Sequence, residues 1–296
     1  MFDFRYHALS LVAVFVALGV GLLLGVAIGD QELVSSAKKD LVSGLRHDVQ
    51  NANTRADALQ AQLNQRDEFE REAYPALVGN TLPGRRVGVL FLGSPSSDVY
   101  NGVSAALQGT GGGVGFVGVV REPPDINGLA ARAGSTRYST LGADSGLLEP
   151  FAERVGRGLV QSGALAKQER SALLSSFSGD LSGVDAVIVY RSAGAPDPKN
   201  AGVDRSLEDG LITGMRNANV PVVGVETTGT DPSQASWYRG HGMPSVDNID
   251  HIAGRAALVF LLSEDATGTY GEKPTAEALL PRLVGTSTAD ATIPSP

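Results

Sequence analysis

The chain contains an unbroken apolar segment at residues 8–29, in which Ser10 carries the only polar side chain. A helix needs about 20 apolar residues to cross the hydrocarbon core of a bilayer, and this segment is long enough. Polar and charged residues begin at Asp30. We therefore expect residues 1–30 to form an N-terminal membrane anchor helix.

Small residues recur at every fourth position of this segment. On a helix this spacing places them on one stripe, where small side chains let a second helix approach closely in lipid. Chance spacing is the alternative, because glycine is common in membrane helices. The predicted helix-packing residues are Ala13, Ala17, Gly21, Gly25 and Gly29.

A cleaved signal peptide is the other interpretation of the same segment. Arg5 supplies a basic start, and residues 27–29 supply a site for cleavage. The apolar segment is longer than the core of a typical signal peptide, which favours an uncleaved helix. In both interpretations the rest of the chain is exported.

The charges that flank the segment predict its orientation. Arg5 precedes it, whereas Asp30 and Glu32 follow it. Positive charge prefers the cytoplasm, and acidic residues contribute little. We predict a single-pass protein of the cell membrane or envelope whose C-terminal domain is extracytoplasmic.

The composition excludes some functions. The 296 residues carry a formal net charge of −8. This acidic balance argues against a nucleic-acid partner, because phosphate recognition needs clustered Lys and Arg. The sequence has no cysteine, which excludes disulfides, thiolate metal ligands and thiol nucleophiles.

Residues 31–74 are polar and, apart from Gly44, almost free of helix breakers. Apolar residues recur at heptad positions a and d over about three heptads, which predicts a coiled-coil spacer and a homo-oligomer. A single amphipathic helix lying on the soluble domain is the alternative. Pro75 is expected to end the helix, and residues 75–84 to form a linker. The predicted seam consists of Val42, Leu45, Val49, Ala52, Ala56, Leu59 and Leu63.

Residues 85–284 alternate between short, Val-rich strands and helices. This alternation predicts an α/β domain with a largely parallel, doubly wound sheet of the Rossmann or flavodoxin-like kind, covered by helices on both faces. The pattern between residues 121 and 181 indicates helix and loop. Residues 285–296 are expected to form a disordered tail. Strands are predicted at 85–93, 114–120, 184–190 and 220–225, and helices from about Val99 and at 206–215 and 251–262.

Catalytic and phosphate-binding motifs give no support for an enzyme. Gly113-x-Gly115-x-x-Gly118 has the spelling of a dinucleotide fingerprint, but it lies within a predicted strand instead of opening a helix. The sequence contains no P-loop, nucleophile elbow or zinc-protease helix. We predict a protein that is not an enzyme, and we assign no catalytic residue and no cofactor.

Polar residues follow the predicted strands, at the edge where doubly wound sheets bind ligands. Ser96, Ser97 and Asp98 first of all predict a helix cap. A small-ligand site is the alternative, by analogy of fold alone. The edge segments are 93–98, 121–122, 191–192 and 226–228.

Soft metal ligands are few. His241-Gly-Met243 resembles a copper-binding pair, since imidazole and thioether both suit copper. One pair supplies too few ligands for a closed site. We therefore favour an ordinary loop histidine and assign no metal-binding residue.

One further pattern at the N-terminus is Arg5-x-His7-x-x-Ser10-Leu11-x-x-x-Phe15-x-Ala17-Leu18-x-x-Gly21-x-x-Leu24-Gly25. Later in the chain stand Val246-Asp247-Asn248-x-Asp250, Tyr270-Gly271 and Leu279-Leu280-Pro281. Together these patterns resemble the mycobacterial copper transport protein B family of actinobacteria. The order of anchor, coiled coil and α/β domain is also the order in this family.

The resemblance implies a role in copper transport, efflux or homeostasis in the cell envelope, with copper ion and envelope proteins as partners. A channel-like role is proposed for the family. Short strands interleaved with helices do not fit a membrane barrel, and one helix encloses no channel, although a ring of helices would. The alternative function is a non-catalytic coiled-coil adaptor in envelope assembly or cell separation.

Overall fold

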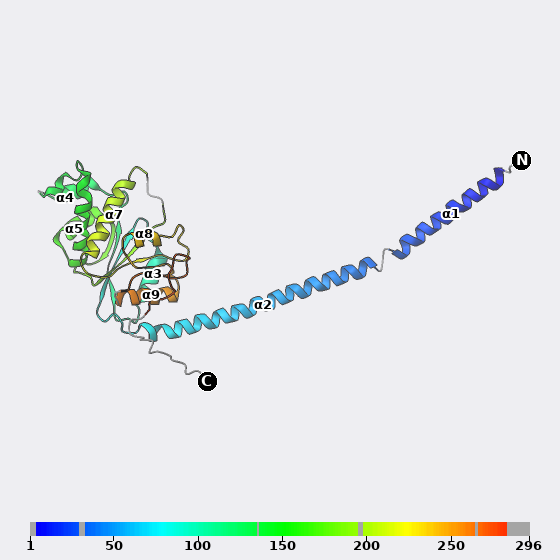
Figure 1. Cartoon of the computed structure of the whole chain (residues 1–296), viewed down its shortest axis with the longest axis horizontal. Coiled ribbons are helices and arrows are strands. Elements are labelled where there is room, and N and C mark those ends of the chain that lie inside the picture. The colour runs from blue at the N-terminus through cyan, green and yellow to red at the C-terminus, as the bar shows by residue number, and fades with distance from the viewer. Residues whose placement is uncertain (1–3, 30–32, 135, 195–197, 264–265, 283–296) are drawn as a thin grey trace, which may run out of the picture. The chain divides into compact units, whose positions relative to one another are not determined.

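The computed structural model describes residues 4–29, 33–134, 136–194, 198–263 and 266–282 (Figure 1). The predicted tail at residues 285–296 lies outside the described residues. The chain divides into two compact units, Met1–Glu68 and Phe69–Pro296. The domain boundaries predicted from the sequence stay predictions.

Helix α1 spans Phe4–Gly29. Within the described residues, its segment Arg5–Ala27 is the one helix that is long and apolar enough to cross a membrane. The cause is the composition of the segment, in which the apolar side chains point in every direction around the helix axis. This arrangement is typical of a helix surrounded by lipid.

Helix α2 spans Leu33–Val78. The predicted end at Pro75 is therefore wrong, because the helix continues past the proline for most of a turn. Tertiary contacts hold this last turn: the Tyr74 hydroxyl donates to the carbonyl of Ala106 at 2.8 Å, and Val78 is fully buried. Packing of the terminal turn thus overrides the tendency of proline to end a helix.

Seven strands within the described residues form one sheet, in the order β3-β2-β1-β4-β5-β6-β7. All neighbouring pairs are parallel except β2 and β3, which are antiparallel. The predicted α/β class with a largely parallel sheet is confirmed. The strands are β1 Arg86–Leu92, β2 Gly113–Val120, β3 Leu174–Gly179, β4 Ala186–Arg191, β5 Val222–Val225, β6 Ser245–Val246 and β7 Thr269–Tyr270.

The helices of this unit pack on both faces of the sheet, as the continuous apolar strands require. Short 3₁₀ turns lie at Arg137–Thr140 and Ser145–Leu147. The helices are α3 Ser97–Leu107, α4 Ile126–Arg132, α5 Leu148–Gln161, α6 Ala164–Leu173, α7 Ala201–Arg216, α8 Ala235–Gly240 and α9 Ile252–Ser263.

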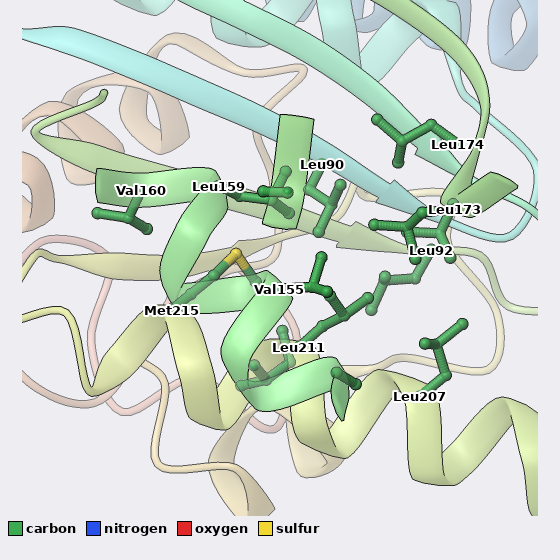
Figure 2. Close-up of a cluster of buried hydrophobic side chains, with 14 of the residues drawn as sticks. Leu90, Leu92, Val155, Leu159, Val160, Leu173, Leu174, Leu207, Leu211 and Met215 are labelled. Atoms are coloured by element: carbon green, nitrogen blue, oxygen red, sulfur yellow. The ribbon is translucent and has the colours of Figure 1, made fainter. Parts of the chain in front are cut away.

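Alternate residues of β1 show how the two cores are divided. Val89 and Phe91 belong to one buried cluster, together with apolar residues of α3 and α9. Leu90 and Leu92 belong to the other, which α5 and α7 close with residues such as Val155 and Leu211 (Figure 2). Because side chains alternate across a strand, one strand serves both cores.

Strand β3 was not predicted, so the expectation of helix and loop between residues 121 and 181 is wrong there. Its sequence, Leu-Ser-Ser-Phe-Ser-Gly, is largely polar and mostly exposed. It lies at the edge of the sheet and pairs with β2 alone. An edge strand that buries few side chains carries little apolar periodicity, which removes the signal that identified the central strands.

Candidate functional site

The carboxyl ends of β1 and β4 mark the point at which the order of the strands reverses. The chain proceeds from β1 to β2 on one side, whereas β4 and β5 extend the sheet on the other side. In doubly wound sheets, ligands bind in the crevice outside this point. The residues after these strands are therefore the first candidates for a functional site.

Residues that follow β1, β2 and β4 meet there. Gly93 has a φ of +83°, and a Cβ at this position would overlap the hydroxyl of Ser192 and lie 3.0 Å from Glu122 Oε2. Glycine both permits the left-handed turn and leaves room for these two side chains. The structure thus brings together three of the edge segments indicated by the sequence.

Two further predicted edge residues, Ser96 and Arg121, have structural roles. Ser96 caps α3, since its Oγ accepts from the Val99 amide at 3.3 Å. Arg121 donates through Nε to the carbonyl of Ala172 at 3.2 Å. The cap interpretation of the Ser-rich turn is confirmed for Ser96.

Arg191 also lies at this edge, but its guanidinium is occupied by protein partners. It donates to Glu208 Oε2 at 3.0 Å and to Gln234 Oε1 at 2.7 Å, and it lies over the ring of Trp237. Burial raises the pKa of Glu208, against the lowering effect of the Arg191 charge. These contacts hold the Arg191 side chain in one position and occupy donors that a ligand would need.

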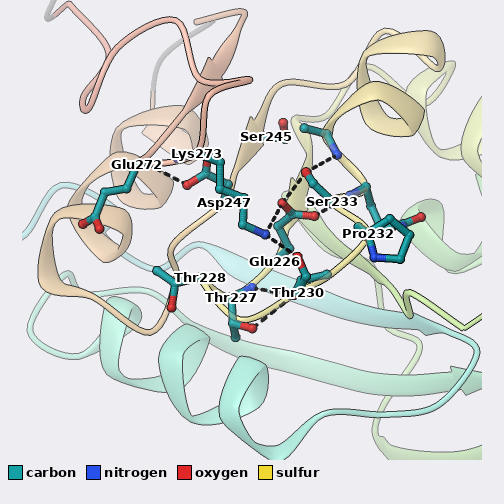
Figure 3. Close-up of polar contacts among 12 residues, drawn as sticks. Glu226, Thr227, Thr228, Thr230, Pro232, Ser233, Ser245, Asp247, Glu272 and Lys273 are labelled. Atoms are coloured by element: carbon teal, nitrogen blue, oxygen red, sulfur yellow. Dashed lines mark hydrogen bonds and ion pairs between the residues drawn. The ribbon is translucent and has the colours of Figure 1, made fainter.

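A second polar cluster lies beyond the carboxyl end of β5, around the buried carboxylate of Glu226 (Figure 3). Its Oε1 accepts from Lys273 Nζ at 2.8 Å and from Ser233 Oγ at 2.6 Å, and its Oε2 accepts from the Gln234 amide at 2.6 Å. The ammonium of Lys273 also donates to the Thr230 carbonyl at 2.7 Å. Sequence reasoning missed Lys273, because 47 residues separate it from its partner.

Asp247 holds the segment that carries Lys273 in place. Its Oδ1 accepts from the Glu272 amide at 2.8 Å, and its Oδ2 accepts from the Lys273 amide at 3.1 Å. Gly271 has a φ of +138°, and a Cβ there would overlap the Asp247 carboxylate. Burial raises the pKa of Asp247, although the two amide donors oppose the effect.

Two of the short patterns behind the family resemblance thus form one clasp. Asp250 belongs to the same pattern as Asp247 and accepts from the amide and hydroxyl of Thr228, at 2.9 and 2.6 Å. Asp247 binds the amides of Glu272 and Lys273, which directly follow Tyr270-Gly271, whereas Asp250 binds Thr228. The described contacts give these carboxylates a structural role, since each is aimed at protein donors.

The histidine and methionine of the copper-like pair are not available as ligands. His241 Nδ1 lies 2.8 Å from the Trp237 carbonyl, and Nε2 lies 2.7 Å from Asp209 Oδ1. Met243 is buried in the core with only 3% of its surface exposed. Both ring nitrogens of His241 thus contact protein acceptors, and the absence of a metal ligand here stays a prediction.

His251 is half-exposed and presents one ring nitrogen. Its Nδ1 lies 2.9 Å from Glu272 Oε1, while Nε2 is 4.0 Å from Asp250 Oδ2. The contact with Glu272 raises the pKa of this imidazole. Among the residues that the structure describes, no group of three or more His, Cys, Asp or Glu side chains is arranged to hold a metal ion.

Comparisons with known proteins agree with the resemblance seen in the sequence. Residues 1–121 match the family model described as "Copper transport outer membrane protein, MctB". The chain is also 28% identical over 239 residues to the copper transporter MctB of Mycobacterium bovis (strain ATCC BAA-935 / AF2122/97). The same values hold for the copper transporter MctB of Mycobacterium tuberculosis strains CDC 1551 / Oshkosh and ATCC 25618 / H37Rv. The alignments cover 76% of this chain and 68% of each relative. The resemblance to this family is confirmed.

Proposed function

We propose that this chain takes part in copper transport in the cell envelope, as a membrane-anchored component that works as a homo-oligomer. The observation that carries the proposal is the similarity to copper transporters, which covers the anchor, the spacer and much of the α/β unit. The comparisons favour this function over an adaptor in envelope assembly or cell separation.

The anchor supports the membrane part of this proposal. Segment Arg5–Ala27 of α1 exposes its apolar side chains along its whole length. Transfer of such a surface into lipid is favourable, at roughly 25 cal/mol per Å² of apolar area removed from water. We propose that α1 spans the membrane once, uncleaved, with its N-terminus inside and the α/β unit outside.

Helix α2 supports the self-association. The seven seam residues are all exposed on α2, and Leu45, Val49 and Leu59 each leave more than half of their surface uncovered. A row of apolar residues at a and d is buried when a second copy of the same helix packs against it. We propose that two or more copies pair along this seam, so that their anchors lie near one another.

Copper enters this proposal as cargo. The described residues form no group of three or more His, Cys, Asp or Glu side chains that could hold a metal ion, so we assign no copper-binding residue within the described part of one copy. A channel-like route would require a ring of α1 helices from several copies, in which the small residues at positions 13, 17, 21 and 25 permit close packing.

Growth of a deletion strain across a range of copper concentrations tests the function. We expect the deletion to change copper tolerance and the wild-type chain to restore it. A Leu45→Asp/Leu59→Asp variant should fail to restore tolerance, because charges in the seam separate the copies. Ala61→Asp, which adds a charge at the outward heptad position f of the same helix, is the matched control and should restore it. Normal copper tolerance of the deletion strain, together with a defect in division or envelope assembly, would overturn the proposal.

The same deletion strain tests whether an exposed histidine of this chain binds copper directly. His251→Asn and His47→Asn remove exposed imidazoles without emptying a buried position. We expect both variants to restore copper tolerance. Failure of either variant at wild-type protein levels would show that a single imidazole handles copper directly.

A further inference from the structure

A pocket of about 390 Å³ lies where the last turns of α2 meet the end of α3 and the start of α9. Pockets for small ligands have volumes of roughly 300–1,000 Å³, so the size is sufficient for one. Its apolar wall includes Pro75, Ile252 and the ring of Tyr74, and two arginines, Arg71 and Arg255, also line it. The pocket residues do not include the carboxylates of the clasp, although Arg255 contacts the backbone of Ile249 and Asp250.

The walls of this pocket are held by defined contacts. The Tyr74 hydroxyl donates to the Ala106 carbonyl at 2.8 Å, which joins α2 to α3. Arg255 donates through Nε to the Ile249 carbonyl at 3.3 Å and through Nη2 to the Asp250 carbonyl at 2.9 Å. The guanidinium is thus oriented by backbone groups through Nε and Nη2, and none of the described hydrogen bonds involves Nη1.

Neither Arg71 nor Arg255 makes an ion pair among those described for this part of the chain, such as the pairs of Arg86, Arg157 and Arg191 with carboxylates. Two arginines thus line this pocket together with the apolar side chains of Pro75 and Ile252. Guanidinium binds carboxylate and phosphate strongly, through charge-assisted hydrogen bonds.

We propose that this pocket binds an amphiphilic anion, such as a fatty acid or an alkyl phosphate. The charged head lies between Arg71 and Arg255, and the start of the alkyl chain lies on Pro75, Ile252 and the ring of Tyr74. Copper ions are excluded as ligands here, because two guanidiniums repel a cation. The site is therefore separate from the proposed transport of copper.

Isothermal titration of the full chain in nonionic detergent with decanoate tests this proposal. We expect saturable binding to the wild type and at least a tenfold weaker affinity for Arg71→Gln and for Arg255→Gln. Arg205→Gln, an exposed arginine on α7 away from the pocket, is the matched control and should bind like the wild type. Arg71 makes none of the described hydrogen bonds, so its variant tests the site even where Arg255→Gln disturbs the fold.

Three further probes separate the parts of the ligand. Hexyl phosphate, which also has an anionic head and an alkyl chain, should bind and should lose affinity in the same variants. Decanol, which lacks the charge, and inorganic phosphate, which lacks the chain, should bind at least tenfold more weakly than decanoate. Equal binding of decanol or of inorganic phosphate overturns the proposal, and so does equal binding of decanoate by the wild type and Arg71→Gln.

Discussion

Lys273 and Glu226 form a buried ion pair that joins the C-terminal part of the α/β unit to the edge of the sheet (Figure 3). We expect Lys273→Met to lower the free energy of unfolding by about 3–5 kcal/mol, because it leaves the Glu226 carboxylate buried without its cation. The double variant Glu226→Gln/Lys273→Met should recover a large part of this loss. Urea unfolding of the full chain in detergent, followed by the fluorescence of the single tryptophan, measures both effects. If the single and the double variant lost equal free energies of unfolding, the unpaired charge of Glu226 would not be the cause of the loss.

Glu169 predicts a dependence of stability on pH. Its side chain is fully buried on α6, neither carboxylate oxygen has a hydrogen-bond partner in the described structure, and burial raises its pKa to about 7. Because the pKa in the folded state exceeds that in the unfolded state, the contribution of Glu169 to the free energy of unfolding is greatest below about pH 4.5, the usual pKa. This contribution is lost as the pH rises through about 7.

Glu169→Gln keeps this position uncharged at every pH. We expect the variant to be more stable than the wild type by about 1–3 kcal/mol at pH 8, and the difference to vanish near pH 4. Glu72→Gln, an exposed carboxylate on α2, should show no such convergence. The same urea experiment at several pH values measures this, and a difference that stays constant with pH would refute the assignment.

At the scale of elements, α2 carries the prediction of self-association. The wild-type chain should be larger than a monomer in detergent, and Leu59→Asp/Leu63→Asp should shift it toward the monomer because each copy then places charges in the seam. Ala61→Asp lies on the same helix between these positions and should leave the association unchanged. Analytical ultracentrifugation measures the mass. A wild-type monomer would defeat the proposed pairing.

The central elements could be predicted from the sequence because their residues are buried on both faces. Strands β1, β4 and β5 contain runs of valine, leucine and isoleucine, and their predicted positions differ from the structure by a few residues at most. The short strands β6 and β7 were not predicted. Two residues, such as Ser245 and Val246, are too few to show a period, and their pairing depends on neighbours distant in the sequence.

The candidate site was predictable only where local sequence determines it. The polar turn after β1 could be located, because a strand followed by Gly93 and a capping serine has a local pattern. The clasp of Asp247 with the amides at residues 272 and 273 could not, because it joins segments 25 and 26 residues apart. The sequence signal for Asp247 was its position, as a charged residue directly after Val246.

At the scale of the whole molecule, the copper-related role has to be reconciled with the side chains that the chain offers to copper. The comparisons support a copper-related role, whereas the described residues offer no group of three or more His, Cys, Asp or Glu side chains that could hold a metal ion. The two observations agree if several copies act together at the membrane. A copper-related role then depends on how the chain is anchored and oriented in the membrane. The apolar segment predicts the anchor, and a few flanking charges predict the orientation.

Orientation is the prediction on which the other whole-molecule arguments depend. Arg5 precedes the apolar segment, while Asp30 and Glu32 follow it, and positive charge prefers the cytoplasm. Protease added to intact spheroplasts should therefore degrade the α/β unit, while a cytoplasmic marker protein stays intact. The sequence of the mature N-terminus, determined on the same sample, should begin at or next to Met1 because the segment is too long for a typical signal peptide. Protection of the α/β unit until the cells are lysed would reverse the orientation, and a mature protein that begins at Asp30 would show that the anchor is removed.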